Sequence, residues 1–259
     1  MKTSIKLVLI YFLMQLAGAL TIYPLCIAYF YFVEGRLMGE VAPSVVPLPL
    51  LLGFLYMGIY LWKENYLTGN ARLYSPVSFS CIAWSLAAGA SSFYLIDTLM
   101  SQLSFLPDWL DDTFELMQTG WVGILCLSVL GPVLEELLFR GAITKVLLER
   151  YTPGKAILIS GLIFGIFHLN PAQVVGACLY GFLFAWLYYK SGSLVPGILL
   201  HILNNSLSVW FSLNYEKTDT MADILGTPAY WAGLVVAVLL LVLSLKKLNN
   251  MTMIQTTEQ

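Results

Sequence analysis

Three short groups of polar side chains interrupt the apolar second half of the chain. They are Glu135, Glu136 and Arg140 in LEELLFR, His168 in FGIFHLNP, and His201, Asn204 and Asn205 in PGILLHILNNS. The two histidines are the only ones in the sequence. A carboxylate can act as a base, and histidine and asparagine side chains can donate hydrogen bonds toward a common point. These residue types therefore indicate acid–base chemistry inside an apolar region.

The spacing within LEELLFR separates an ion pair from a free carboxylate. Glu136 and Arg140 are four residues apart with the acid first, which is the better orientation for an ion pair along a helix. Glu135 is rotated by about 100° from Glu136 and lacks that partner. We therefore expect Glu136 and Arg140 to be structural and Glu135 to carry the chemistry. The alternative is that Glu135 is a second structural acid, bonded to a neighbouring helix.

The third group places two hydrogen-bond donors on one helix face. His201 and Asn205 are four residues apart, whereas Asn204 points elsewhere and is expected to form an interhelical hydrogen bond. At about 1.5 Å per residue, Glu135 and His168 lie about 18–20 Å from the inner ends of their helices, and His201 and Asn205 about 10–16 Å. These groups can meet near the midplane of a membrane, toward its cytoplasmic half, if their helices pack together.

The composition identifies the solvent around these groups. Of 259 residues, 59% are hydrophobic and 11% are charged, against about 25% charged in typical soluble domains. So few charges predict an all-α, polytopic membrane protein. Ionisable side chains inside a membrane span cost about 2.5–3.5 kcal/mol each on insertion scales, so they are functional candidates. The four cysteines lie in apolar runs without CxxC spacing, and we expect no disulfide and no cysteine metal site.

The pattern of apolar runs predicts eight membrane-spanning helices. A bilayer core of about 30 Å needs roughly 20 apolar residues per helix. The predicted spans are 7–32, 45–62, 77–96, 121–149, 156–169, 172–189, 194–213 and 229–245. The fourth contains Gly131-Pro132, where we expect a kink or a break. Between the third and fourth spans, FLPDWLDDTFELMQ predicts an interfacial helix.

The basic residues indicate which loops face the cytoplasm. If both chain ends are cytoplasmic, most lysines and arginines fall inside, and only Arg36 and Lys217 fall outside with the acidic stretch Asp97–Glu115. Those on the inner side are Lys2, Lys6, Lys63, Arg72, Lys145, Arg150, Lys155, Lys190, Lys246 and Lys247. We therefore predict cytoplasmic N- and C-termini.

The chain is predicted to form a single integral membrane domain over residues 1–259. Residues 1–119 hold the N-terminal helices and the outside acidic loop, 120–213 the core helices with the polar groups, and 214–259 the last helix and a polar, disordered tail. Lys2, Lys6 and Ala17-Gly18-Ala19 also fit a signal peptide, but the apolar run continues through Phe32 and is longer than such a segment.

The three polar groups together resemble the CPBP intramembrane protease family. The matching positions are Glu135-Glu136-x-x-x-Arg140, Phe164-x-x-x-His168 and His201-x-x-x-Asn205, in the family's order, over about residues 120–213. The family includes the type II CAAX prenyl endopeptidases and Abi-like bacterial proteins of bacteriocin processing or immunity. Each motif alone is weak, but three in order on three predicted spans are specific.

The resemblance implies an eight-helix endopeptidase with its active site inside the bilayer. Glu135 with His168 would activate a water, His201 and Asn205 would stabilise the oxyanion, and Glu136 and Arg140 would support them. The implied substrate is a membrane-associated protein or peptide, with the lipid bilayer as the other partner. We expect a bacterial inner (cytoplasmic) membrane location and no nucleic-acid partner.

Alternatives remain for the metal and for the class of protein. No cofactor is favoured; if zinc is present, Glu135, His168 and His201 would hold it. A catalytic zinc site usually shows a close helical pair such as HExxH, and the sequence has none. A non-catalytic membrane regulator or immunity protein on the same scaffold is the main alternative. A transporter is the third, although the sequence lacks the internal repeats that it predicts.

Overall fold

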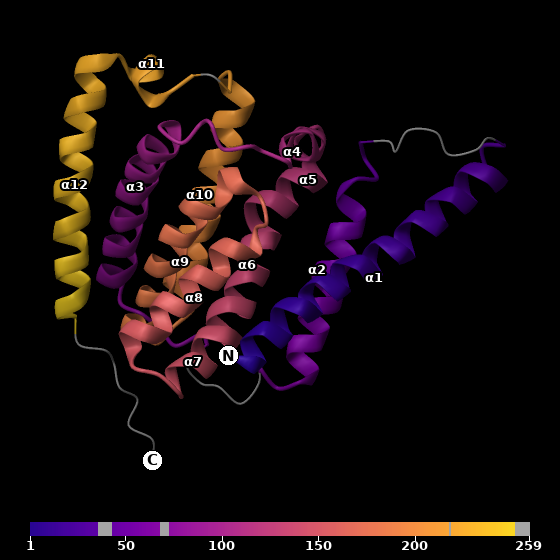
Figure 1. Ribbon diagram of the computed structural model, residues 1–259, viewed down its shortest axis with the longest axis horizontal. Helices are drawn as coiled ribbons and strands as arrows, with labels where there is room; N and C mark the ends of the chain where they lie inside the picture. The colour runs from indigo at the N-terminus through magenta and orange to yellow at the C-terminus, as the bar shows by residue number, and fades with distance from the viewer. Residues whose placement is uncertain (36–42, 68–72, 218, 252–259) are drawn as a thin grey trace.

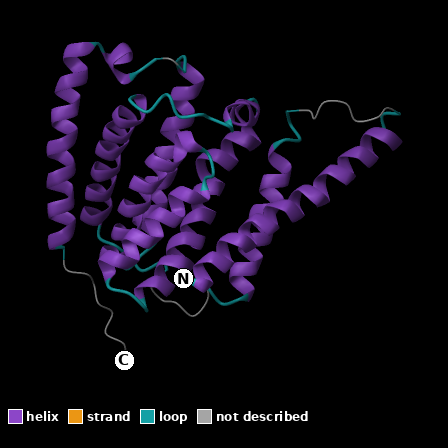
Figure 2. Ribbon diagram, in the orientation of Figure 1, coloured by secondary structure: helices purple, strands orange, loops and turns teal. Residues whose placement is uncertain are grey.

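The structure is a computed structural model that describes residues 1–35, 43–67, 73–217 and 219–251. Every regular element in those ranges is a helix (Figure 2). The predicted all-α fold is therefore confirmed. Arg36, Arg72 and the predicted polar tail from residue 252 onward lie outside the described residues.

Apolar helices occupy all eight predicted spans. They are α1 (Lys2–Phe32), α2 (Pro47–Lys63), α3 (Phe79–Ser101), a continuous helix of α5 (Trp121–Leu125), η1 (Cys126–Leu130), α6 (Gly131–Glu136), η2 (Leu137–Thr144) and α7 (Lys145–Leu148), then α8 (Pro153–Phe167), α9 (Pro171–Ser191), α10 (Val195–Asn214) and α12 (Thr227–Asn250). In the described ranges, five of these are long and apolar enough to cross a membrane. The chain is thus an integral membrane protein, and the count of eight spans stays a prediction.

The remaining two helices lie at the same end of the bundle. The predicted interfacial helix is α4 (Asp111–Gln118), and α11 (Met221–Leu225) precedes the last helix. Both lie at the end away from the N-terminus, whereas the start of α1, α7 and the end of α12 share the other end (Figure 1). This arrangement fits an even number of crossings. Which membrane face each end meets stays a prediction.

The outer helices face lipid, and the continuous helix of residues 121–148 forms the core. Large apolar side chains are exposed along α1 and α12, as a bilayer solvent requires. The η1 and α6 parts of the helix of residues 121–148 contact α2 and α10, and its η2 part contacts α1, α8 and α9. Its Phe139 is fully buried and packs edge-on against Phe164 of α8, with ring centroids 4.9 Å apart.

The break considered at Gly131-Pro132 does not occur, because the helix continues through the proline as a π segment. Whether the helix axis kinks there stays a prediction. The segment η1 is a π-helix, and the N–H of Gly131 donates to the carbonyl of Cys126, five residues back. Pro132 has no N–H. The carbonyl of Leu127 could accept a hydrogen bond from the backbone N–H of residue 131 or 132. The first of these donates to Cys126 and the second is missing, so this carbonyl has no backbone donor from either position. A helix that continues through a proline in this way leaves an acceptor free for another element.

Candidate active site

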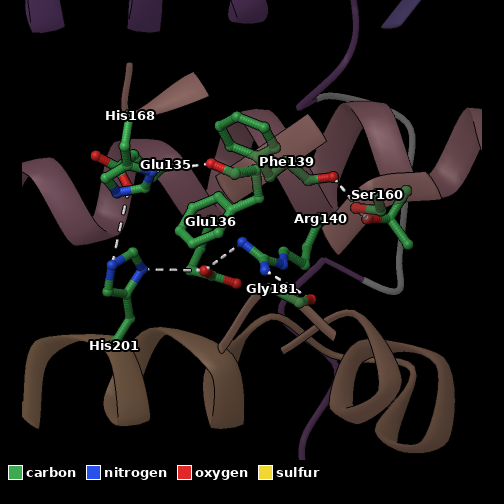
Figure 3. A network of polar contacts seen from close by, with 10 residues as sticks. Glu135, Glu136, Phe139, Arg140, Ser160, His168, Gly181 and His201 are labelled. Atoms are coloured by element: carbon green, nitrogen blue, oxygen red, sulfur yellow. Dashed lines mark hydrogen bonds and ion pairs between the residues drawn. The ribbon is translucent and has the colours of Figure 1, made fainter. Parts of the chain in front are cut away.

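Three helices bring the predicted site residues into one region of the core (Figure 3). Glu135 and Glu136 end α6, where the helix passes into the second π segment, η2. His168 caps the C-terminus of α8, and His201 and Asn205 lie along α10. The convergence that the sequence made conditional on helix packing is present in the structure.

Glu136 is the centre of a buried ion-pair network. Its Oε1 accepts hydrogen bonds from Nη1 of Arg140 at 2.8 Å and from Nδ1 of His201 at 3.1 Å. Glu136 and Arg140 are both 0% exposed. The predicted Glu136–Arg140 pair is confirmed, whereas the bond to His201 is new because it depends on how α10 packs. Pairing offsets the desolvation cost of the two buried charges.

Arg140 fastens the central helix to two others. Its Nη2 donates to the carbonyl of Gly181 at 3.1 Å, and its guanidinium lies over the ring of Phe164 at 4.4 Å. The absence of a side chain at Gly181 lets α8 and α9 come into close contact there, since a Cβ at Gly181 would lie 2.8 Å from the Cα of Gly161. Sequence reasoning missed Gly181, since its contribution is a backbone carbonyl rather than a side chain.

A second glycine makes room for Glu136 itself. A Cβ at Gly197 of α10 would lie 2.9 Å from Oε2 of Glu136. The fully buried carboxylate thus fits only against a residue without a side chain. The PG dipeptide at the start of α10 signals a helix start, not this close approach, and so the sequence alone did not identify Gly197 as part of the site.

Glu135 differs from its neighbour in having little support. Its side chain is 16% exposed, and its Oε2 lies 3.7 Å from Nε2 of His201, beyond hydrogen-bond length. No residue in the described ranges donates a hydrogen bond to this carboxylate. His201 therefore lies between the two glutamates, with one ring nitrogen toward each (Figure 3). Glu135 is the carboxylate that remains free to accept a proton.

Hydrogen-bond partners fix the proton on one nitrogen of each histidine. Nδ1 of His168 lies 2.8 Å from the carbonyl oxygen of Phe164, which only accepts, so this nitrogen donates. Neutral His168 then has its lone pair on Nε2. Nδ1 of His201 donates likewise to the ionised Glu136. His201 can therefore donate a second hydrogen bond through Nε2 only when both of its ring nitrogens carry protons.

Asn205 is oriented by the carbonyl that the π turn leaves free. Its Nδ2 donates to the carbonyl of Leu127 at 2.9 Å, and its Oδ1 accepts from Nδ2 of Asn204 at 3.1 Å. The second Nδ2 hydrogen of Asn205 stays available. The prediction that Asn204 makes the interhelical bond is wrong: Asn205 makes it, because Pro132 leaves an acceptor opposite that position.

A cavity of about 590 Å³ reaches this site from the end of the bundle that carries α4 and α11. Its inner lining includes His168, His201 and Asn205, of which His201 is buried. Its outer lining includes the exposed Glu216 and Lys217. Depth along the helices predicted a site toward the cytoplasmic half, but the opening is at the opposite end from the start of α1 and the end of α12.

The metal alternative finds no support in the arrangement of ligands. In the part of the chain that the structure describes, no group of three His, Cys, Asp or Glu side chains is placed to hold a metal ion. Glu135, His168 and His201 therefore do not fit the zinc set considered from the sequence. One nitrogen of His201 is already committed to Glu136. Metal independence stays a prediction.

Comparison with known proteins gives a family for the central segment. Residues 117–207 match the family described as Type II CAAX prenyl endopeptidase Rce1-like. The matched range contains all three motifs and both π segments. The resemblance to the CPBP family drawn from the motifs is confirmed.

A bacterial relative matches part of the chain. The chain is 36% identical over 116 residues to the Bacillus subtilis (strain 168) protein named "Putative membrane peptidase YdiL". The match covers 43% of this chain and 48% of that protein, so the chain spans about half the length of this relative. No solved structure matches the chain.

Proposed function

Since its motif-bearing segment belongs with the type II CAAX endopeptidase-like proteins, we propose that the chain is an intramembrane endopeptidase. It hydrolyses a peptide bond of a membrane-associated protein or peptide. The observation that carries this proposal is the position of His201 between Glu135 and Glu136, at the inner end of a cavity that His168 and Asn205 also line. A free carboxylate, a histidine lone pair and two oriented donors are the groups that peptide hydrolysis needs.

In the proposed reaction, Glu135 and Nε2 of His168 orient a water molecule beside the substrate carbonyl. Glu135 takes a proton from the water as its oxygen forms a bond to the carbonyl carbon. The carbonyl oxygen becomes an oxyanion and accepts hydrogen bonds from His201 and from the second Nδ2 hydrogen of Asn205. Glu135 then returns the proton to the amide nitrogen as the C–N bond breaks. Each oxyanion donor is worth about 2.7–4 kcal/mol in such reactions.

The Glu136–Arg140 pair has a positioning role in this scheme. Glu136 holds Nδ1 of His201 and so directs Nε2 toward Glu135 and the cavity. Arg140 neutralises Glu136 and anchors it to α9 through Gly181. We place the protein in a bacterial cytoplasmic membrane with both ends cytoplasmic. The cavity then opens toward the opposite face.

The test compares the peptide termini of membrane and secreted proteins in cells that carry the native chain or Glu135→Ala at equal levels. Removing the base is expected to lower cleavage by about 10²–10⁴-fold, so a terminus should appear only with the native chain. Glu149→Ala is the matched control, because Glu149 is exposed at the end of the same continuous helix, away from the site. Identical termini and an unchanged phenotype would instead favour a non-catalytic regulator on this scaffold.

A further inference from the structure

We propose that the outer half of the cavity binds a positively charged segment of the peptide substrate. This inference rests on the proposed function, since it names the substrate class of the same site. The outer half is defined by the acidic side chains of the cavity lining, here called the acidic lining. They are Asp97, Asp108, Asp111, Glu115, Glu216 and Asp219.

The charge of the acidic lining is strongly one-sided. Six carboxylates and one lysine, Lys217, give a formal net charge of −5. They come from three separate segments, α3, the region of α4, and the connection between α10 and α11, which meet only in the folded chain. A cleft with one sign of charge and apolar walls concentrates its field and attracts the opposite charge. A segment with lysine or arginine therefore complements this cavity.

The chain already shows how the acidic lining holds an ammonium group. Nζ of Lys217 pairs with Asp111 at 2.6 Å and also with Glu115. These contacts raise the pKa of Lys217, so it stays charged. Lys217 is the single lysine or arginine among the described lining residues, and it pairs with only two of the six carboxylates. The same arrangement can receive a substrate cation beside it.

A buried hydroxyl deeper in the cavity also lacks a partner. Tyr180 of α9 lines the cavity and is 8% exposed, and its hydroxyl has no hydrogen-bond partner in the described structure. Leaving such a group unpaired costs about 1–3 kcal/mol. Its ring packs against that of Phe184, at 5.5 Å between centroids, and the ring of Phe184 lies 5.0 Å from that of His201. A peptide bound in this part of the cavity would supply the missing partner. This independent observation points to a ligand in the same space.

The test measures binding separately from cleavage. The full chain carrying Glu135→Gln is placed in nanodiscs of zwitterionic phosphatidylcholine, so that the lipid itself attracts no cation. Two fluorescent peptides of equal length and apolar content are compared, one with three lysines and one with three glutamines. We expect the lysine peptide to bind about tenfold more tightly, and its advantage to shrink between 0.05 and 1 M salt as the Debye length falls to about 3 Å.

Two further variants locate the binding surface. Asp97→Asn/Glu216→Gln in the Glu135→Gln background is expected to remove most of the lysine preference, with little change for the glutamine peptide. Asp112→Asn is the matched control, since Asp112 is exposed on α4 but does not line the cavity. Equal affinity for both peptides, or a preference that survives the double substitution, would overturn the proposal.

The outcomes for binding and for catalysis are distinguishable. If the terminus comparison identifies a substrate with no lysine or arginine near the cleaved bond, the charge proposal fails and the endopeptidase stands. If no terminus depends on Glu135 but the lysine peptide still binds through the acidic lining, the cavity is a receptor for cationic peptides and the endopeptidase proposal fails.

Discussion

The inner cluster of Glu135, Glu136, Arg140 and His201 contrasts with the acidic lining at the outer end of the same cavity. Glu136 and Arg140 are 0% exposed and contact each other, whereas the Lys217 and Glu115 side chains are more than half exposed. In the inner cluster each charged group faces an opposite or protonatable group. The acidic lining keeps an excess of negative charge.

The difference follows from the solvent available to each region. A buried charge must be paired because its desolvation costs several kcal/mol, and breaking the pair leaves that cost uncompensated. Exposed carboxylates keep their hydration, and salt screens their repulsion. The inner cluster is therefore critical for stability as well as for the proposed catalysis. Four members of the acidic lining, Asp108, Glu115, Glu216 and Asp219, are exposed, so neutralising them costs the fold little and their charges are free to serve recognition.

Substitution of the buried arginine is expected to have the largest effect, a loss of fold stability. Arg140→Ala strands Glu136 and is expected to destabilise the fold by about 3–5 kcal/mol, seen as loss of folded protein in detergent. Lys217→Ala is the control at the acidic lining and should leave folded yield unchanged, because its ion pairs are exposed. Equal yields for both variants would contradict the structural role of the buried pair.

A double substitution separates stability from chemistry in the inner cluster. Glu136→Gln/Arg140→Met removes both charges together and is expected to recover most of the folded yield that Arg140→Ala loses. Activity should remain low, because the charged carboxylate that accepts the hydrogen bond from Nδ1 of His201 is lost. Full recovery of activity would show that the pair has only a structural part.

Restoring the missing backbone donor should have a smaller effect. Pro132→Ala supplies an N–H that competes for the carbonyls of the π turn, so Asn205 loses its fixed orientation. We expect kcat to fall by up to about tenfold, matching one hydrogen bond of about 0.5–1.5 kcal/mol, with KM and folded yield little changed. Pro228→Ala is the control, since Pro228 is exposed in the first turn of α12, where no donor is needed. Equal kcat in both variants would exclude this orienting role.

Metal removal is expected to have the smallest effect. Dialysis of the purified protein against a strong chelator should leave cleavage of the identified peptide unchanged, because one nitrogen of His201 is committed to Glu136 and no three ligands in the described ranges are placed to hold an ion. Elemental analysis of the same samples is the check. Stoichiometric zinc whose removal abolishes activity and whose return restores it would overturn metal independence.

Much of the fold and part of the site could be predicted from the sequence. The apolar runs place all eight helices within a few residues, and α4 falls inside the predicted acidic segment. The four-residue spacing gives the Glu136–Arg140 pair, because one helix fixes both positions. The break considered at Gly131-Pro132 is wrong, because the helix continues through the proline as a π segment, an outcome that depends on packing around the helix.

The sequence by itself determined the solvent, the helices and the Glu136–Arg140 contact within one helix, since these depend only on composition and local spacing. Tertiary structure decided the contacts between helices: His201 between two glutamates, the carbonyl of Gly181 on Arg140, and Leu127 on Asn205. It also decided that acids from three segments line one cavity. Such contacts depend on the rotation and depth of each helix, which close packing at glycines fixes and which no local pattern encodes.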